Sequence, residues 1–157
     1  MKKLLVLFVV LNCTMCIAQK VIVDGIVYKI KGETAYASKM SDSKSEVAII
    51  RSSISYNGQE YPVTSIRDYS FQCYEYLRKV SIPNSVKILG RNAFNSCPNL
   101  QEITVPDEPM RIDAAFRNCN GIIKVKCQNG SLPEYMLSLL PEKCIFMIKY
   151  KNGTLNQ

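Results

Sequence analysis

The sequence contains no histidine. Histidine is the usual base that activates a serine or cysteine nucleophile and is a frequent zinc ligand. Its absence therefore excludes Ser-His-Asp sites, Cys-His sites and His-ligated zinc sites. A Ser-Lys pair or a pair of carboxylates is compatible with the composition, but no segment isolates one, and Asp107-Glu108 is interpreted as a solvated turn. We predict that the protein is not an enzyme and that it has no catalytic residue and no cofactor.

Long apolar runs are also missing, except for one at the start of the chain. Two lysines precede the apolar run Leu4–Leu11, and Cys16-Ile-Ala18 places small residues where a signal peptidase cleaves. The run is too short to span a bilayer, which takes about 20 residues. We predict a signal peptide over residues 1–18 with cleavage before Gln19. The expected protein is exported without a transmembrane anchor, as a secreted, cell-surface or periplasmic protein.

Basic residues are not massed in any part of the sequence. The formal charge of +7 falls to +5 when the two lysines of the predicted signal peptide are removed, and the remaining lysines and arginines are scattered. A nucleic-acid-binding protein usually shows a basic stripe or a known module. We therefore predict no nucleic-acid partner.

The sequence does contain an internal repeat. Two copies lie at a constant offset of 23 residues, and their matched pairs are Val63 and Val86, Ile66 and Leu89, Phe71 and Phe94, Leu77 and Leu100, Val80 and Ile103, Ile82 and Val105, and Pro83 and Pro106. A third copy, one residue shorter, includes Ile112, Phe116 and Cys119. Seven matches at one period indicate a repeat architecture.

Half a copy precedes these repeats. In this half copy Val47 and Ile49 match Val80 and Ile82. Asn57-Gly58, which lies between flanks of alternating apolar residues, predicts an inserted hairpin turn before the first full copy.

Each copy has the features of one coil of a solenoid. Val80-Ser-Ile82 alternates between apolar and polar residues, as a strand does, and Pro83 ends the strand because it has no amide donor. The return limb from Val86 through Phe94 to Leu100 has apolar spacing too irregular for a long helix. One copy alone would expose its apolar side. Stacked copies bury it, and their strands align into a short parallel sheet on one face.

The fixed positions of the copies form a longer motif, apolar-x-x-apolar-Gly-x-x-Ala-Phe-x-x-Cys-x-x-Leu-x-x-apolar-x-apolar-Pro. Val86–Pro106 match it throughout, whereas Val63–Pro83 have Arg67 in place of the glycine, Ser70 in place of the alanine, and Cys73 one place early. The motif resembles the BspA-type leucine-rich repeats of bacterial surface and secreted proteins. The resemblance implies an α/β, β-rich leucine-rich-repeat solenoid and, for larger relatives, adhesion or interaction with a host surface.

The segments that flank the repeats are expected to cap the exposed ends of the core. We predict an N-terminal β cap, repeats of 22–23 residues, and a C-terminal cap with a tail, over residues 19–46, 47–127 and 128–157 respectively. The N-terminal cap is predicted to be a β-hairpin over Val21–Met40. The C-terminal cap is predicted to combine a short helix over Ser131–Leu140 with a strand over Cys144–Tyr150.

Five of the seven cysteines follow the predicted signal peptide. Cys97 and Cys119 occupy the same repeat position, and we predict buried thiols there because free cysteine packs as a small hydrophobe. Whether these two, Cys127 and Cys144 are thiols or disulfides stays open, and Cys127–Cys144 is the favoured pair if a bridge forms. After residue 18 the chain has no C-x-x-C spacing. This argues against a cysteine-only zinc site, so we predict no metal ligand.

Alternation along the three predicted strands places six polar side chains on the open face of the sheet: Lys79, Ser81, Glu102, Thr104, Lys124 and Lys126. Repeat proteins use such extended faces to bind partners. An alternating ladder of Lys79, Glu102 and Lys124 would equally stabilise a solvated face. Both interpretations stand.

Two functions fit these observations. The first is an exported, non-catalytic binding module for a protein or glycan partner at the cell surface, with a role in adhesion. The alternative is a structural or assembly component of the bacterial envelope that docks through its ends. The oligomeric state and the identity of the ligand are left open.

Overall fold

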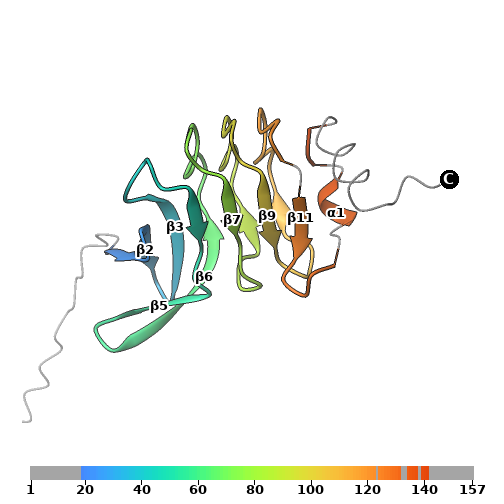
Figure 1. The fold of residues 1–157 in the computed structure, drawn as a ribbon. Helices are drawn as coiled ribbons and strands as arrows, with labels where there is room; N and C mark the ends of the chain where they lie inside the picture. Colours follow the sequence, from blue (N-terminus) through green and yellow to red (C-terminus); the bar gives the residue numbers. More distant parts are fainter. Residues whose placement is uncertain (1–18, 123, 132–133, 138, 142–157) are drawn as a thin grey trace, which may run out of the picture.

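The structure is a computed structural model that describes residues 19–122, 124–131, 134–137 and 139–141 (Figure 1). The described residues form stacked coils, and two ladders that contain parallel strands run along the stack. The stacked coils and the parallel strands confirm the predicted solenoid.

The first ladder is a four-stranded parallel sheet with the order β11-β9-β7-β4. Its strands are β4 (Val47–Ile49), β7 (Lys79–Ser81), β9 (Glu102–Val105) and β11 (Lys124–Cys127). At equivalent positions each strand directs one aliphatic side chain into the core, and these are Ala48, Val80, Ile103 and Val125. The residues on either side of them face outward, as the two-residue period of a strand requires.

A second ladder runs along the return limbs of the coils. Its parallel strands are β3 (Thr34–Met40), β6 (Gln59–Ile66), β8 (Ile88–Leu89) and β10 (Arg111–Ile112). The sequence predicted a parallel sheet on one face only, so the second ladder corrects that prediction. Strands of two residues are too short to show an alternating pattern, and this is why the return limb read as irregular.

The N-terminal cap contains three antiparallel strands in place of the single predicted hairpin. These are β1 (Lys20–Val23), β2 (Ile26–Lys31) and β3. The chain turns at Asp24-Gly25 and at Gly32, where φ is positive. Because β3 also pairs in parallel with β6, the cap is continuous with the second ladder.

A β-hairpin is inserted between the cap and the first full coil. β5 (Ser53–Tyr56) pairs antiparallel with β6, and the turn at Asn57-Gly58 has φ values of 50° and 77°. Two successive positive φ values favour the right-handed twist of a tight hairpin. The turn predicted from Asn57-Gly58 is confirmed, and the hairpin projects from the stack at the lower left of Figure 1.

The register of β4 corrects the sequence alignment by one residue. Val47 pairs with Lys79 and Ile49 pairs with Ser81, whereas the sequence matched them to the inward residues Val80 and Ile82. A slip of one residue moves every side chain of a strand to the other face. Val47 and Ile49 are therefore 44% and 54% exposed, and Ala48 is the residue that enters the core.

A column of three phenylalanine rings runs through the core along the axis of the stack. The rings of Phe71 and Phe94 stack with centroids 5.0 Å apart, and those of Phe94 and Phe116 with centroids 5.4 Å apart. All three side chains are buried. The repeat spacing therefore placed these residues correctly as core positions.

The C-terminal cap is less helical than predicted. Of the predicted helix over Ser131–Leu140, the structure describes α1 (Glu134–Leu137) as helical, whereas the described residues Ser131, Leu139 and Leu140 are not helical. Met136 and Leu140 are buried, which closes part of this end of the core. The predicted strand over Cys144–Tyr150 lies outside the described residues.

Candidate binding face

The outward residues of the four-stranded sheet form two rows that cross all four strands. We call this surface the open face. Its first row is Val47, Lys79, Glu102 and Lys124, and its second row is Ile49, Ser81, Thr104 and Lys126. The parallel register brings together all six site residues that the sequence predicted. Each one has a predicted neighbour directly across the ladder.

Glu102 lies between two lysines of the first row. Its Oε2 atom is 3.9 Å from Nζ of Lys79 and 3.6 Å from Nζ of Lys124. The alternating ladder predicted from the sequence is thus present, and its binding role is a separate question. All three side chains are well exposed, and exposed ion pairs contribute about 0–1 kcal/mol each to stability. The ladder therefore orders the lysines more than it holds the fold together.

Apart from Ile49, the residues of the second row are less accessible than those of the first. Thr104 is only 8% exposed, and Ser81 and Lys126 are half-buried. A partner that approaches the open face would meet the lysines and Val47 and Ile49 before it met the hydroxyl of Thr104.

Val47 and Ile49 belong to the open face but were missed as site residues. Both were assigned to the core because they are aliphatic and spaced two apart. The sequence offers a second apolar pair with the same spacing, Ala48 and Ile50, which could have been assigned to the core instead. In the structure this second pair is the buried one. The open face thus has an apolar end at β4 and a basic end at β11.

Hydrogen bonds between polar side chains connect the turns that follow the strands of the four-stranded sheet. Nδ2 of Asn84 donates to Asp107 Oδ2 at 2.8 Å, and the backbone N–H of Asn129 donates to Asp107 Oδ1 at 2.8 Å. The hydrogen bonds from Asn129 and Asn84 lower the pKa of Asp107. The carboxylate therefore stays ionised and fixes the strand ends at one edge of the open face.

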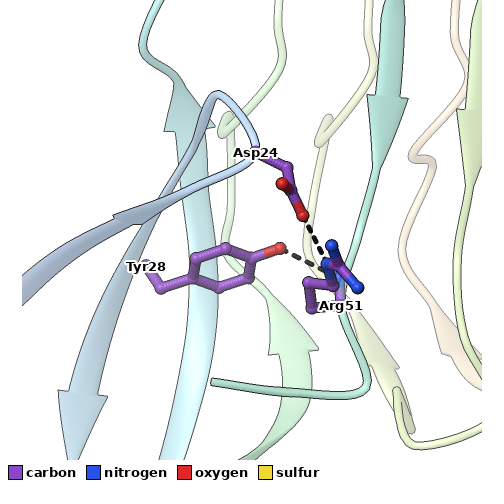
Figure 2. A network of polar contacts seen from close by, with 3 residues as sticks. All are labelled: Asp24, Tyr28 and Arg51. Carbon is purple, nitrogen blue, oxygen red and sulfur yellow. Dashed lines mark hydrogen bonds and ion pairs between the residues drawn. The ribbon is translucent and has the colours of Figure 1, made fainter. Parts of the chain in front are cut away.

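The apolar end of the open face is joined to the cap by three residues (Figure 2). The guanidinium of Arg51, just after β4, forms an ion pair with Asp24 in the turn between β1 and β2. The backbone N–H of Arg51 donates to Tyr28 Oη at 2.9 Å. Tyr28 is fully buried, and burial raises the pKa of its hydroxyl. The network fixes the chain where it leaves β4, so Val47 and Ile49 are presented on a supported strand.

The geometry of the coils agrees with the comparison to known families. The family described as BspA type Leucine rich repeat region (6 copies) matches residues 49–140, which is more than half of the chain. The chain belongs to the BspA-type leucine-rich repeat family. No curated protein matches it.

Solved structures of other leucine-rich proteins share the BspA-type fold of this chain. A leucine rich cell surface protein from Faecalibacterium prausnitzii has a TM-score of 0.57 at 22% identity, covering 80% of this chain and 37% of that one. A leucine-rich repeat protein from Bacteroides capillosus has a TM-score of 0.55 at 29% identity, covering 69% of this chain and 98% of that one. A protein from Bacteroides ovatus has a TM-score of 0.55 at 22% identity, covering 68% of this chain and 29% of that one. The chain thus spans little more than a third of the first of these proteins.

The cysteine position of the BspA-type coils holds a stack of buried sulfur atoms. Sγ of Cys97 donates to the carbonyl oxygen of Phe71 at 3.1 Å, and Sγ of Cys119 donates to that of Phe94 at 2.8 Å. Cys119 also hydrogen-bonds to Cys97 and lowers the pKa of that thiol, although burial opposes the effect. These contacts support the predicted thiols at both positions. The favoured Cys127–Cys144 pair involves a residue outside the described part of the chain.

Thiol labelling should separate Cys73 from Cys97. Cys73 is exposed, whereas Cys97 is fully buried. We expect a maleimide to modify Cys73 in the native protein on the order of 10³ times faster than Cys97, because a core thiol becomes reachable only when its coil unfolds. Peptide mapping by mass spectrometry gives both rates, and in urea the two should react alike. Comparable native rates would contradict the buried position of Cys97.

Neither a cluster of metal ligands nor a membrane-spanning helix occurs in the part of the chain that the structure describes. Among the described residues, no group of three or more His, Cys, Asp or Glu side chains is placed to hold a metal ion. In the same part of the chain no helix is long and apolar enough to cross a membrane.

Proposed function

We propose that this chain is an exported, non-catalytic binding module that contacts a protein or glycan partner at the cell surface through the open face, with a role in adhesion. The observation that carries the proposal is the contrast between the two sides of the four-stranded sheet. The inward residues are aliphatic in every coil, whereas the outward residues of the first row change from Val47 to Lys79 to Glu102 to Lys124. Packing in the core accounts for the aliphatic residues on the inward side. Contact with a partner would account for the variation among the outward residues.

The proposed location of the protein at the cell surface rests on two further observations. The first 18 residues have the pattern of a signal peptide, and the Faecalibacterium structure with the same fold is described as a cell surface protein. The proposal of a non-catalytic role rests on the absence of histidine from the sequence.

Alanine at Lys79, Glu102 and Lys124 together should weaken partner capture by about tenfold or more, because removal of central interface residues commonly costs over 1 kcal/mol each. The measurement is capture from envelope and host-matrix extracts by the immobilised protein, followed by quantitative titration of whatever is retained.

The matched control is alanine at Lys31, Glu33 and Lys87, which removes the same charges from exposed positions away from the open face. Both triple variants should unfold within about 1 kcal/mol of the parent chain, since only exposed groups are lost. Equal capture by the two variants would overturn a binding role for the open face.

A second candidate function is assembly of the envelope through the end of the stack. The observation that favours it is β4, which is an edge strand of the four-stranded sheet and carries the exposed side chains of Val47 and Ile49. Exposed aliphatic edge strands promote pairing between chains. Under this alternative Ile49→Lys would abolish self-association or co-purification, as read by analytical ultracentrifugation. A parent chain that stays strictly monomeric and partnerless would count against it.

A further inference from the structure

We propose that a hollow between the second and third coils binds the oxyanion group of an acidic saccharide. The hollow has a volume of about 280 Å³ and is lined by Arg91, Asn92, Asp113, Ala114 and Arg117. None of these residues belongs to the four-stranded sheet, so the hollow is a site separate from the open face.

The hollow lies where the third coil is one residue shorter than the second. Leu89 pairs with Ile112 at an offset of 23, whereas Asn92 and Ala114, which share a positive φ, are offset by 22. One residue, Asp113, thus stands where the second coil has two, Gly90 and Arg91. The shorter coil therefore covers the second coil less completely at this point.

The residues that line the hollow include two arginines and one aspartate. Nε of Arg91 lies 3.0 Å from Oδ2 of Asp113, and its backbone N–H donates to Asp68 Oδ1 at 2.9 Å. Asp113 raises the pKa of Arg91, which stays charged. Arg117 makes no ion pair with any residue that the structure describes. The lining thus holds two guanidinium groups and one carboxylate, and the carboxylate is paired with Arg91. Asp68 lies outside the lining and accepts from the backbone N–H of Arg91, so the guanidinium of Arg117 is the group left for a ligand.

The lining selects the class of ligand. A guanidinium presents parallel N–H donors that match the oxygens of a carboxylate or a sulfate. The volume falls below the range of about 300–1,000 Å³ that is usual for whole ligands, so the hollow suits one charged group of a larger molecule. Oδ1 of Asn92 is buried without a hydrogen-bond donor among the described residues. A saccharide hydroxyl could donate to Oδ1 of Asn92 after a rotation about the terminal torsion of that side chain, whereas sulfate has no donor to offer.

The test is a titration of the ¹⁵N-labelled protein with sodium glucuronate, sodium sulfate, an acidic peptide and glucose in parallel, followed by NMR at the Arg117 side chain and the Ala114 amide. We expect glucuronate to bind with a dissociation constant on the order of 1 mM, as suits one charged group, and more tightly than sulfate or the peptide. Glucose should cause no shift. Equal binding of sulfate and glucuronate would reveal an adventitious ion only and would overturn the proposal. Tighter binding of the peptide, or no binding at all, would also overturn it.

Two variants should shift the affinity in opposite directions. Arg117→Gln should weaken glucuronate binding about tenfold or more, because a charge-assisted pair is lost. Asp113→Asn should strengthen it several-fold, because Arg91 loses its competing carboxylate. Arg78→Gln is the matched control: Arg78 is an exposed, ion-paired arginine whose partner Glu46 precedes β4, and its loss should leave binding unchanged. Unchanged binding in both lining variants would contradict the site.

Discussion

Phe94→Ala should lower the free energy of unfolding by about 3–5 kcal/mol, the range measured for large-to-small changes at buried aromatic sites. Phe94 is fully buried, and its ring stacks on the rings of both Phe71 and Phe116. Alanine would leave a cavity between the rings of Phe71 and Phe116, and each would lose a stacking partner. A loss of this size is a large part of the free energy of unfolding of a typical domain, which is about 5–15 kcal/mol. The measurement is equilibrium unfolding in urea.

Tyr76→Ala provides the control for this variant. Tyr76 lies in the preceding coil and is 51% exposed, so its truncation should change the stability by no more than about 0.5 kcal/mol. A loss below about 1 kcal/mol for Phe94→Ala would mean that the coils do not share one continuous core.

Gly90→Ala should destabilise the protein by about 2–3 kcal/mol, in the upper part of the range for overpacked sites. A Cβ at this position would lie 2.5 Å from the backbone nitrogen of Asp68 and 2.6 Å from the carbonyl carbon of Arg67. These are backbone atoms of the preceding coil, which cannot rotate away as a flexible side chain can. The glycine is therefore required by the close approach of two coils.

Gly58→Ala separates this effect from the loss of glycine in general. A Cβ on Gly58 would meet no atom within 4 Å, although the residue has a positive φ. Alanine there should cost only about 1 kcal/mol, from the left-handed backbone. Urea unfolding of both variants gives the comparison. Equal losses would show that coil contact does not set the requirement at Gly90.

The repeat in the sequence was sufficient to predict the inward residues of the full coils. Phe71, Leu77, Val80 and Ile82 recur because each coil must supply the same wall of a shared core, and all four are fully buried. The pairing of Lys79, Glu102 and Lys124 followed from the same register. Constant spacing between copies thus predicts both sides of the four-stranded sheet.

The sequence predicted the wrong inward residues for β4, which belongs to the half copy and has no complete repeat around it. In β4 the inward position holds Ala48, which carries little apolar signal, while the outward Val47 and Ile49 look like core residues. Pattern alone assigns the larger aliphatic residues to the inside. Only pairing with β7 fixes the correct face.

The departures of the first coil from the motif also have structural causes. Arg67 can replace the glycine because its neighbour is the cap strand β3: its N–H donates to Ala37, and its guanidinium lies 4.7 Å from the ring centroid of Tyr36. Cys73 shares a positive φ with Ser96 and Asn118, so it is not a displaced member of the buried cysteine position. The alignment of the copies reveals these departures but not their causes, because the causes depend on what lies beside each coil.

The sequence predicted which residues lie on the outward side of the sheet, but it did not predict how exposed each side chain is. Thr104 is nearly buried although its strand position faces outward. The hollow beside Arg117 could not be predicted, since it arises from a difference in length between two coils and from the side chains of both.

Lysine footprinting of the captured complex tests most directly whether the open face binds the partner. An amine-reactive reagent is applied to the protein with and without its partner, and the modification of each lysine is measured by mass spectrometry. Lys79 and Lys124 lie on the open face, whereas Lys31 and Lys87 are exposed elsewhere. We expect the partner to protect Lys79 and Lys124 and to leave Lys31 and Lys87 as reactive as before. Protection confined to Lys31 and Lys87, or unchanged reactivity at Lys79 and Lys124, would contradict the account.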